Sequence, residues 1–221
     1  MLNKWLILPA ALLMMLSVAV RAEDYRVEAF EAAPPDDLAP EIAAQIASTG
    51  YKVVEGEKRT ICEIWPAKQW EVKEGFTPTL QILYPLKPGT LAGVLRFPRK
   101  STDFRDQDVS RGLYTLRYSN QPVDGNHVGT FQTRDFLLMV PAENDTSPEP
   151  IEETSLFESS AEAAGSSHPA IMPLMTADAE AEVPGLTHFD DNDWWTIRFA
   201  GTGSDGKKLV VELIVIGHSL E

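Results

Sequence analysis

Short runs of apolar residues, broken by Pro and Gly, dominate the chain after residue 50 and predict β-strands. The stretch 112–118 alternates with period two, which places successive side chains on opposite faces of a strand. The stretch 135–140 is apolar almost throughout, as is typical of a strand buried on both faces. Similar strand-like runs occur at 51–54, 59–65, 79–84, 91–97, 194–199 and 209–216.

One segment near the start has a helical period instead. Leu38, Ile42 and Ile46 recur every four residues, and Gly50 is a natural stop. We therefore predict one N-terminal helix that ends at about Ser48. Many short strands and one early helix favour a mainly β fold, an antiparallel β-sandwich or jelly-roll-like domain.

The first residues have the layout of a secretory signal peptide. Lys4 precedes an apolar run over 5–20, and small residues flank Arg21 before Glu23. We predict that residues 1–22 are a signal peptide and that the mature protein is exported, to the periplasm or beyond the cell. The alternative, a membrane anchor, needs about 20 apolar residues, and the run is shorter. No integral membrane segment is expected after cleavage.

Acidic residues are concentrated in one segment, 143–182. It contains ten Asp or Glu and no Lys or Arg, and it is rich in Ser, Ala, Thr and Pro. This composition predicts a flexible acidic insert. Residues 23–142 and 183–221 would then form a single β-rich domain. The short apolar cluster 171–175 leaves open a second reading, in which part of the insert docks on the core.

Charge and cysteine content exclude some classes of function. The chain has 19 Lys and Arg against 33 Asp and Glu, a net charge of -14, and no dense basic stretch. Nucleic-acid binding needs clustered cations, so we expect no nucleic-acid partner. Cys62 is the single cysteine, which excludes an internal disulfide, and its apolar neighbours predict a buried thiol.

The first candidate for chemistry is the loop that holds Asp124 and His127, with Arg134 following it. A carboxylate that orients an imidazole suits general acid–base catalysis or part of a metal site. The alternative is ordinary turn chemistry around Asp124-Gly125, with Arg134 in a structural ion pair.

A second candidate is an oxygen-rich stretch, in which Asp190, Asp191 and Asp193 flank Asn192. Calcium prefers several such oxygen ligands, so Ca²⁺ is a possible cofactor here. The spacing is not that of an EF-hand, and an Asp-rich turn before a strand is the alternative.

Tryptophans offer a third candidate. Trp70 and Trp195 lie in or beside predicted strands, where an exposed indole can stack on a sugar ring. Packing in the core is the alternative for each of them.

Several stretches between 50 and 142 carry a resemblance to a known family: Gly50-Tyr-Lys-Val-Val, Ile61-Cys-Glu-Ile-Trp, Gly112-Leu-Tyr-Thr-Leu-Arg-Tyr, Asp124-Gly-Asn-His-Val-Gly and Arg134-Asp-Phe-Leu-Leu. They are similar to a family of uncharacterised exported bacterial proteins. The resemblance implies export and a shared β-rich fold, and it implies no activity, cofactor or site residue.

These patterns together predict an exported, non-enzymatic β protein that binds a protein or a small-molecule or glycan ligand. A hydrolase or metal-dependent enzyme that uses Asp124, His127 and Arg134 is the first alternative. A carbohydrate-binding module that uses Trp70 or Trp195 is the second.

Overall fold

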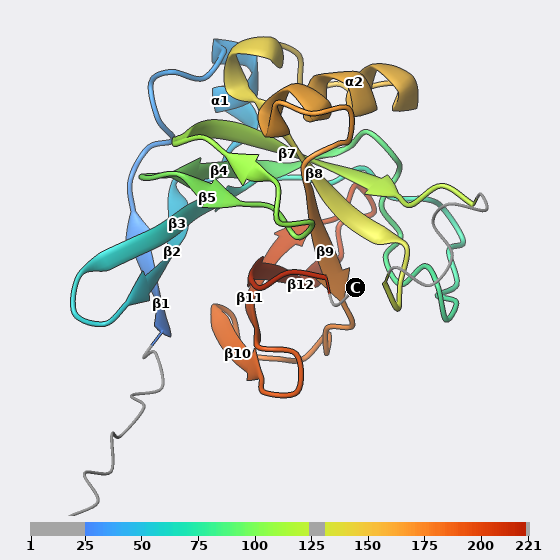
Figure 1. The fold of residues 1–221 in the computed structure, drawn as a ribbon. Coiled ribbons are helices and arrows are strands. Elements are labelled where there is room, and N and C mark those ends of the chain that lie inside the picture. Colours follow the sequence, from blue (N-terminus) through green and yellow to red (C-terminus); the bar gives the residue numbers. More distant parts are fainter. Residues whose placement is uncertain (1–24, 124–130, 220–221) are drawn as a thin grey trace, which may run out of the picture.

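One strongly curved antiparallel sheet of ten strands forms the body of the protein and closes nearly into a barrel (Figure 1). The computed structural model describes residues 25–123 and 131–219. The sheet strands are β1 (Tyr25–Glu31), β2 (Thr49–Glu55), β3 (Arg59–Pro66), β4 (Leu91–Phe97), β7 (Gly112–Asn120), β8 (Asp135–Pro141), β9 (Ile171–Met175), β10 (Gly185–Phe189), β11 (Trp194–Thr202) and β12 (Lys208–Ile216). The other elements are α1 (Pro40–Gln45), the ribbon of β5 (Ser101–Thr102) and β6 (Asp108–Val109), the 3-10 turn η1 (Ala142–Asn144) and α2 (Glu153–Ala164).

The strand order is β1-β2-β3-β4-β7-β8-β9-β12-β11-β10. Each strand up to β9 therefore lies beside the next sheet strand along the chain. After β9 the chain crosses to the far end of the sheet, and β10, β11 and β12 return toward β9. The two end strands, β1 and β10, approach each other, and the Tyr25 and Trp195 rings meet across this seam with centroids 4.8 Å apart.

The predicted mainly β, antiparallel fold is confirmed, but a β-sandwich or jelly roll is not. The ten strands form one continuous hydrogen-bonded sheet rather than two packed sheets. Apolar alternation in a sequence shows which face of a strand is buried. It does not show which strands are neighbours, so the patterns of a sandwich and a curled sheet look alike.

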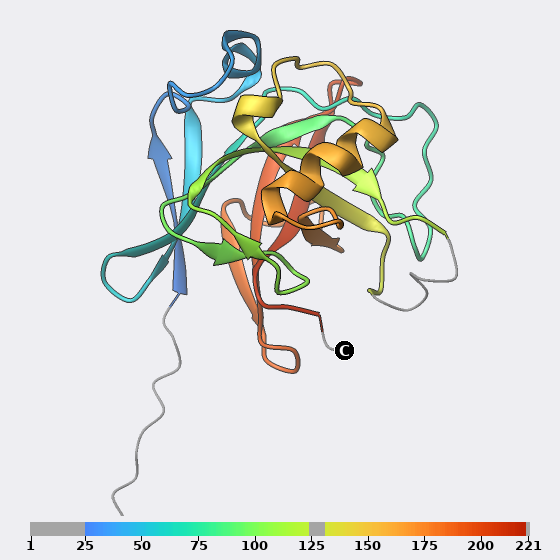
Figure 2. The ribbon, with the colours of Figure 1, turned by 45° about the horizontal axis from the view of Figure 1, so that its top comes forward.

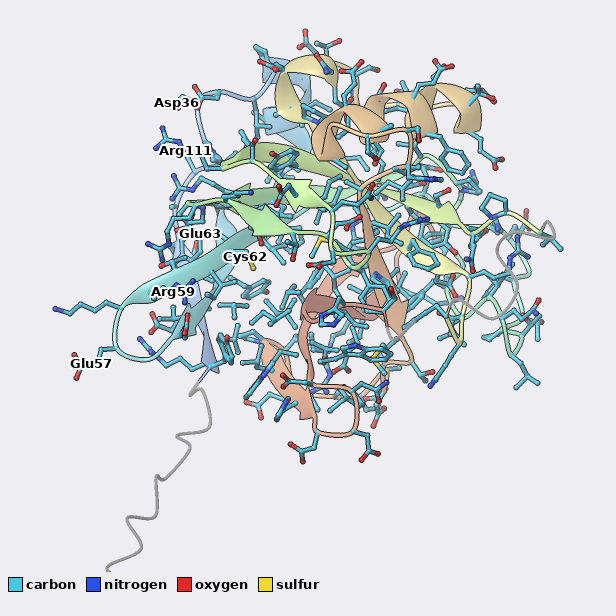
Figure 3. All side chains as sticks on the ribbon, in the orientation of Figure 1. Asp36, Glu57, Arg59, Cys62, Glu63 and Arg111 are labelled. Carbon is cyan, nitrogen blue, oxygen red and sulfur yellow. The ribbon has the colours of Figure 1, made fainter. Side chains whose placement is uncertain are left out.

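Apolar side chains fill the inside of the curved sheet. Cys62, Ile64, Leu95, Leu116 and Leu213 all lie in one core cluster and are fully buried. Figure 3 shows Cys62 on β3, one of the strands that enclose this core. The inside of the sheet is thus a packed core, as in other small barrels.

Helix α1 is shorter than the apolar stripe predicted. It ends at Gln45, because Ile46 adopts an extended conformation and forms a β-bridge with Ala67. Gly50 does not end the helix but lies within β2. A Cβ atom there would lie 2.6 Å from Cζ of Phe30, so this glycine permits close packing in the sheet.

The segment 143–182 differs most from its prediction as a flexible insert. It contains η1 in part, α2 and β9, and β9 lies in the sheet between β8 and β12. Leu156, Ser160 and Ala163 recur along one buried side of α2, and Leu156 packs on the outer face of β8. Figure 2 shows α2 lying across this face of the sheet. The alternative, in which the cluster 171–175 docks on the core, describes the structure better.

A buried ion pair shows why the acidic composition of residues 143–182 wrongly predicted a flexible segment. Arg117 points outward from β7 and is fully buried. Its guanidinium forms a bidentate salt bridge with the Asp145 carboxylate, and both N–O distances are 2.8 Å. The same guanidinium donates to the carbonyls of Ser147 and Glu149. One of the ten acids counted as solvated is therefore the counter-ion that holds the start of the segment against the sheet.

No helix among residues 25–123 and 131–219 is long and apolar enough to cross a membrane.

Candidate functional site

The structure leaves the Asp124, His127 and Arg134 hypothesis undecided. Asp124 and His127 lie outside the described residues. Arg134 is half-buried, and its side-chain Nε donates to the carbonyl of Gln121 at 2.7 Å. The Arg134 side chain therefore holds a neighbouring loop.

Two of the three candidate calcium carboxylates contact a histidine side chain instead of each other. Asp190 and Asp193 each lie 2.9 Å from a different ring nitrogen of His188, and both are highly exposed. Asp191 is also exposed. Within the described part of the chain, no group of three or more His, Cys, Asp or Glu side chains is arranged to hold a metal ion.

The two candidate tryptophans are both covered. Trp70 is fully buried, and its indole N–H donates to the carbonyl of Ala92, so it cannot stack on a sugar. Trp195 is half-buried, with the ring of His188 stacked parallel to it at 4.3 Å and the ring of Tyr25 against it. The His188 ring therefore occupies one face of the Trp195 indole.

A different surface combines exposure with unusual composition. We call it the uncharged loop end, and define it as residues 75–83, 119–123 and 131–133. None of these residues is charged, although 24% of the whole chain is. The β3–β4 connection carries 75–83, and the end of β7 with the β7–β8 connection carries the other two segments. Both connections lie at one end of the sheet, on the right in Figures 1 and 2.

Two large apolar side chains stand out from the uncharged loop end. Leu80 is 94% exposed and Val123 is 81% exposed. They are the only exposed large apolar side chains in the described part of the chain. Loss of charge together with exposed apolar side chains is the composition of a protein–protein contact surface.

Arg134 connects the loops that carry these two side chains. Its backbone N–H donates to the carbonyl of Gln81 at 2.7 Å, and its carbonyl accepts from the N–H of Gln121 at 2.8 Å. Leu80 directly precedes Gln81, and Val123 follows Gln121 by two residues. The Arg134 backbone therefore holds these two loops together. Its part in a catalytic site with Asp124 and His127 stays a prediction.

Asp135 fixes the same end to the sheet. Its carboxylate is fully buried and accepts from the N–H of Leu83 at 2.7 Å and the hydroxyl of Tyr118 at 2.5 Å. Burial raises the pKa of Asp135, and these hydrogen bonds offset part of that rise. Burial is also the main cause that raises the pKa of Tyr118.

Tyr84 extends this buried polar network to strands β9 and β12. Its hydroxyl donates to the carbonyl of Met175 on β9 at 2.5 Å and accepts from the N–H of Glu212 on β12 at 3.2 Å. The hydroxyl thereby bridges the two strands at the end of their short pairing. Burial raises the pKa of Tyr84, so the phenol stays protonated and able to donate.

Sequence reasoning missed Leu80 because the apolar run 79–84 was predicted to be a strand, whereas the structure has a loop there. It missed Val123 because a single apolar residue in a loop carries no motif. A usable signal was present in the absence of charge over 75–83 and 119–123. Only the structure shows that these two stretches, about 40 positions apart in the printed sequence, meet at one end of the sheet.

Comparison with protein-family models, curated proteins and solved structures gives no match for this chain. The resemblance to a family of exported bacterial proteins stays a prediction.

Proposed function

We propose that this protein is an exported, non-enzymatic binding protein whose uncharged loop end docks on a protein partner. The observation that carries the proposal is the joint exposure of Leu80 and Val123 on two loops that Arg134 ties together. Exposed apolar side chains that are already held in place lose little conformational freedom on binding, which favours affinity.

The buried network beneath these loops supports the proposal. Asp135 holds Leu83, and Thr133 donates to the carbonyl of Leu174 on β9 at 2.9 Å. Phe131 packs its ring against Phe104 and Trp194, with centroids 5.4 and 5.6 Å apart. The loop end is therefore anchored at several points, as a preformed binding surface requires.

Site-specific photo-cross-linking tests this function. A photoreactive amino acid is placed at position 80 or 123 in the full chain, produced in its native host. The matched control carries it at Glu57, an exposed position in the β2–β3 turn, on the opposite side of the molecule in Figure 3. We expect the same protein adduct from positions 80 and 123 and none from position 57.

Two results would count against a docking role for the loop end. One is the absence of any adduct at positions 80 and 123. The other is an identical set of adducts at all three positions, which would indicate contacts by chance collision.

A further inference from the structure

The two edge strands of the sheet, β1 and β10, run in opposite directions. The ten strands make nine neighbouring pairs, and each pair is antiparallel. An odd number of antiparallel steps makes the first and last strands antiparallel to each other. β1 and β10, which approach each other in Figure 1, therefore have the relative direction that allows them to pair directly and close the sheet into a barrel.

Three aromatic rings bring the two edges together and suggest their register. The rings of Tyr25 and Trp195 are 4.8 Å apart, and the His188 ring stacks on Trp195 at 4.3 Å. His188 and Trp195 are partners in the β10–β11 register, so Tyr25 lies level with His188. The antiparallel direction then places Val27 opposite Leu186. Both of these side chains are half-buried and pack against the same core cluster, as a cross-strand pair requires.

The backbone of β1 offers the groups that this pairing needs. The N–H of Ala32 donates to the carbonyl of Ser48, which continues the β1–β2 register by one residue. Hydrogen-bonded and non-hydrogen-bonded pairs alternate along an antiparallel ladder. Glu28 therefore bonds to β2, whereas Val27 and Ala29 direct their N–H and C=O groups away from β2. In the described part of the chain, no backbone hydrogen bond joins β1 to β10.

Neither edge has the features that usually keep an edge strand from pairing. β1 and β10 contain no Pro or Lys, and their registers with β2 and β11 run without a bulge. β1 does carry charge, but Arg26 and Glu28 form an ion pair with each other at 2.8 Å. Side chains alternate between the faces of a strand, so this pair lies on the opposite face from Val27. The backbone edge itself stays open to a partner strand.

We propose that β1 and β10 pair antiparallel and close the sheet into a complete barrel, with Val27 opposite Leu186. The contacts of Tyr25 and His188 with Trp195 hold the two strands in this register. Closure satisfies the outward backbone groups of β1 and removes both edges from pairing with other chains. Closure is independent of the proposed docking by the uncharged loop end.

Amide hydrogen exchange, measured by NMR on the isotope-labelled chain recovered from its host, tests the closure. The N–H of Val27 is directed at β10, whereas the N–H of Glu28 bonds to β2 whether the barrel is open or closed. Glu28 is therefore an internal control. We expect Val27 to exchange within about tenfold of Glu28 and at least about 100-fold more slowly than an unprotected amide. A nuclear Overhauser effect between the amide protons of Val27 and Leu186 should confirm the register.

Variants of Tyr25 test the ring contact separately. Tyr25→Ala removes the ring, and we expect the exchange rate of Val27 to rise about tenfold or more. Glu28 should stay within about twofold of its wild-type rate, which shows that β1 still pairs with β2. Tyr25→Phe keeps the ring, so Val27 should exchange within about threefold of wild type.

Four results would overturn parts or all of this inference. If Val27 exchanges like an unprotected amide while Glu28 is protected, the barrel stays open. If the protection of Val27 rises with protein concentration, a second copy of the chain covers β1 instead. If Val27 is protected without a nuclear Overhauser effect to Leu186, the register is wrong. If Tyr25→Ala leaves the exchange of Val27 unchanged, the ring contact does not hold the two strands.

Discussion

Asp135 shows how one buried carboxylate can both build a surface and cost stability. Both of its oxygens accept hydrogen bonds, from Leu83 and Tyr118, so the ionised group is well satisfied. Burial nevertheless outweighs these bonds and raises its pKa above the usual 3.8. The folded protein therefore holds the Asp135 proton more tightly than the unfolded chain does.

This difference predicts a dependence of stability on pH. A raised pKa in the folded state gives stability that is fully present below pH 3.8 and is lost as the pH rises through the folded pKa. Asn cannot ionise, so Asp135→Asn should lose less stability than wild type over that rise. Denaturant unfolding of both proteins at a series of pH values measures the difference.

Asp191→Asn provides the matched reference, because it is the same substitution at an exposed side chain. Parallel curves for wild type and Asp135→Asn across the acid range would contradict the assigned role of Asp135.

Cys62 illustrates a residue whose sequence context was sufficient. It lies between Ile61 and Glu63 on β3, and its side chain enters the core. Burial raises the pKa of its thiol to about 12. At neutral pH the group is therefore a small apolar side chain.

At the level of elements, the pair of Arg117 and Asp145 joins β7 to the segment that precedes α2. Arg117 is fully buried and Asp145 nearly so. The guanidinium needs Asp145 because a buried charge without a counter-ion is strongly unfavourable. The Thr115 hydroxyl donates to the same carboxylate at 2.5 Å.

Asp145→Ala should therefore lower the free energy of unfolding by about 3–5 kcal/mol, the usual cost of leaving one partner of a buried pair alone. Asp191→Ala, the same change at an exposed position, should cost less than about 0.5 kcal/mol. Urea or guanidinium unfolding measures both. Equal losses in the two variants would show that residues 145–149 do not anchor the segment.

The whole molecule is a single curved sheet with three kinds of surface. One outer face is covered by α2, one seam brings Tyr25 of β1 to Trp195 of β11, and one end carries the uncharged loops. The uncharged loop end differs from the chain as a whole in that none of its residues is charged.

Export is the prediction that concerns the whole chain. If residues 1–22 are a signal peptide, the mature protein begins at Glu23 and has 199 residues. Intact mass and N-terminal sequencing of protein recovered from the periplasm or medium should find Glu23 first. Recovery of the full-length chain from the cytoplasm alone would contradict export.

The sequence by itself determined the class of fold, the positions of most long strands, the early α1 segment and the burial of Cys62. These properties follow from local periodicity, because each strand needs one apolar face whatever its neighbours are.

Only the tertiary structure decided which strands pair, that residues 143–182 supply α2 and β9, and that 75–83 meets 119–123. Strand order depends on contacts between distant positions, which local patterns do not encode. Asp145 was counted as a solvated acid because its partner, Arg117, is 28 residues away. The exposure of Leu80 is likewise set by residues that are distant in the sequence and near in space.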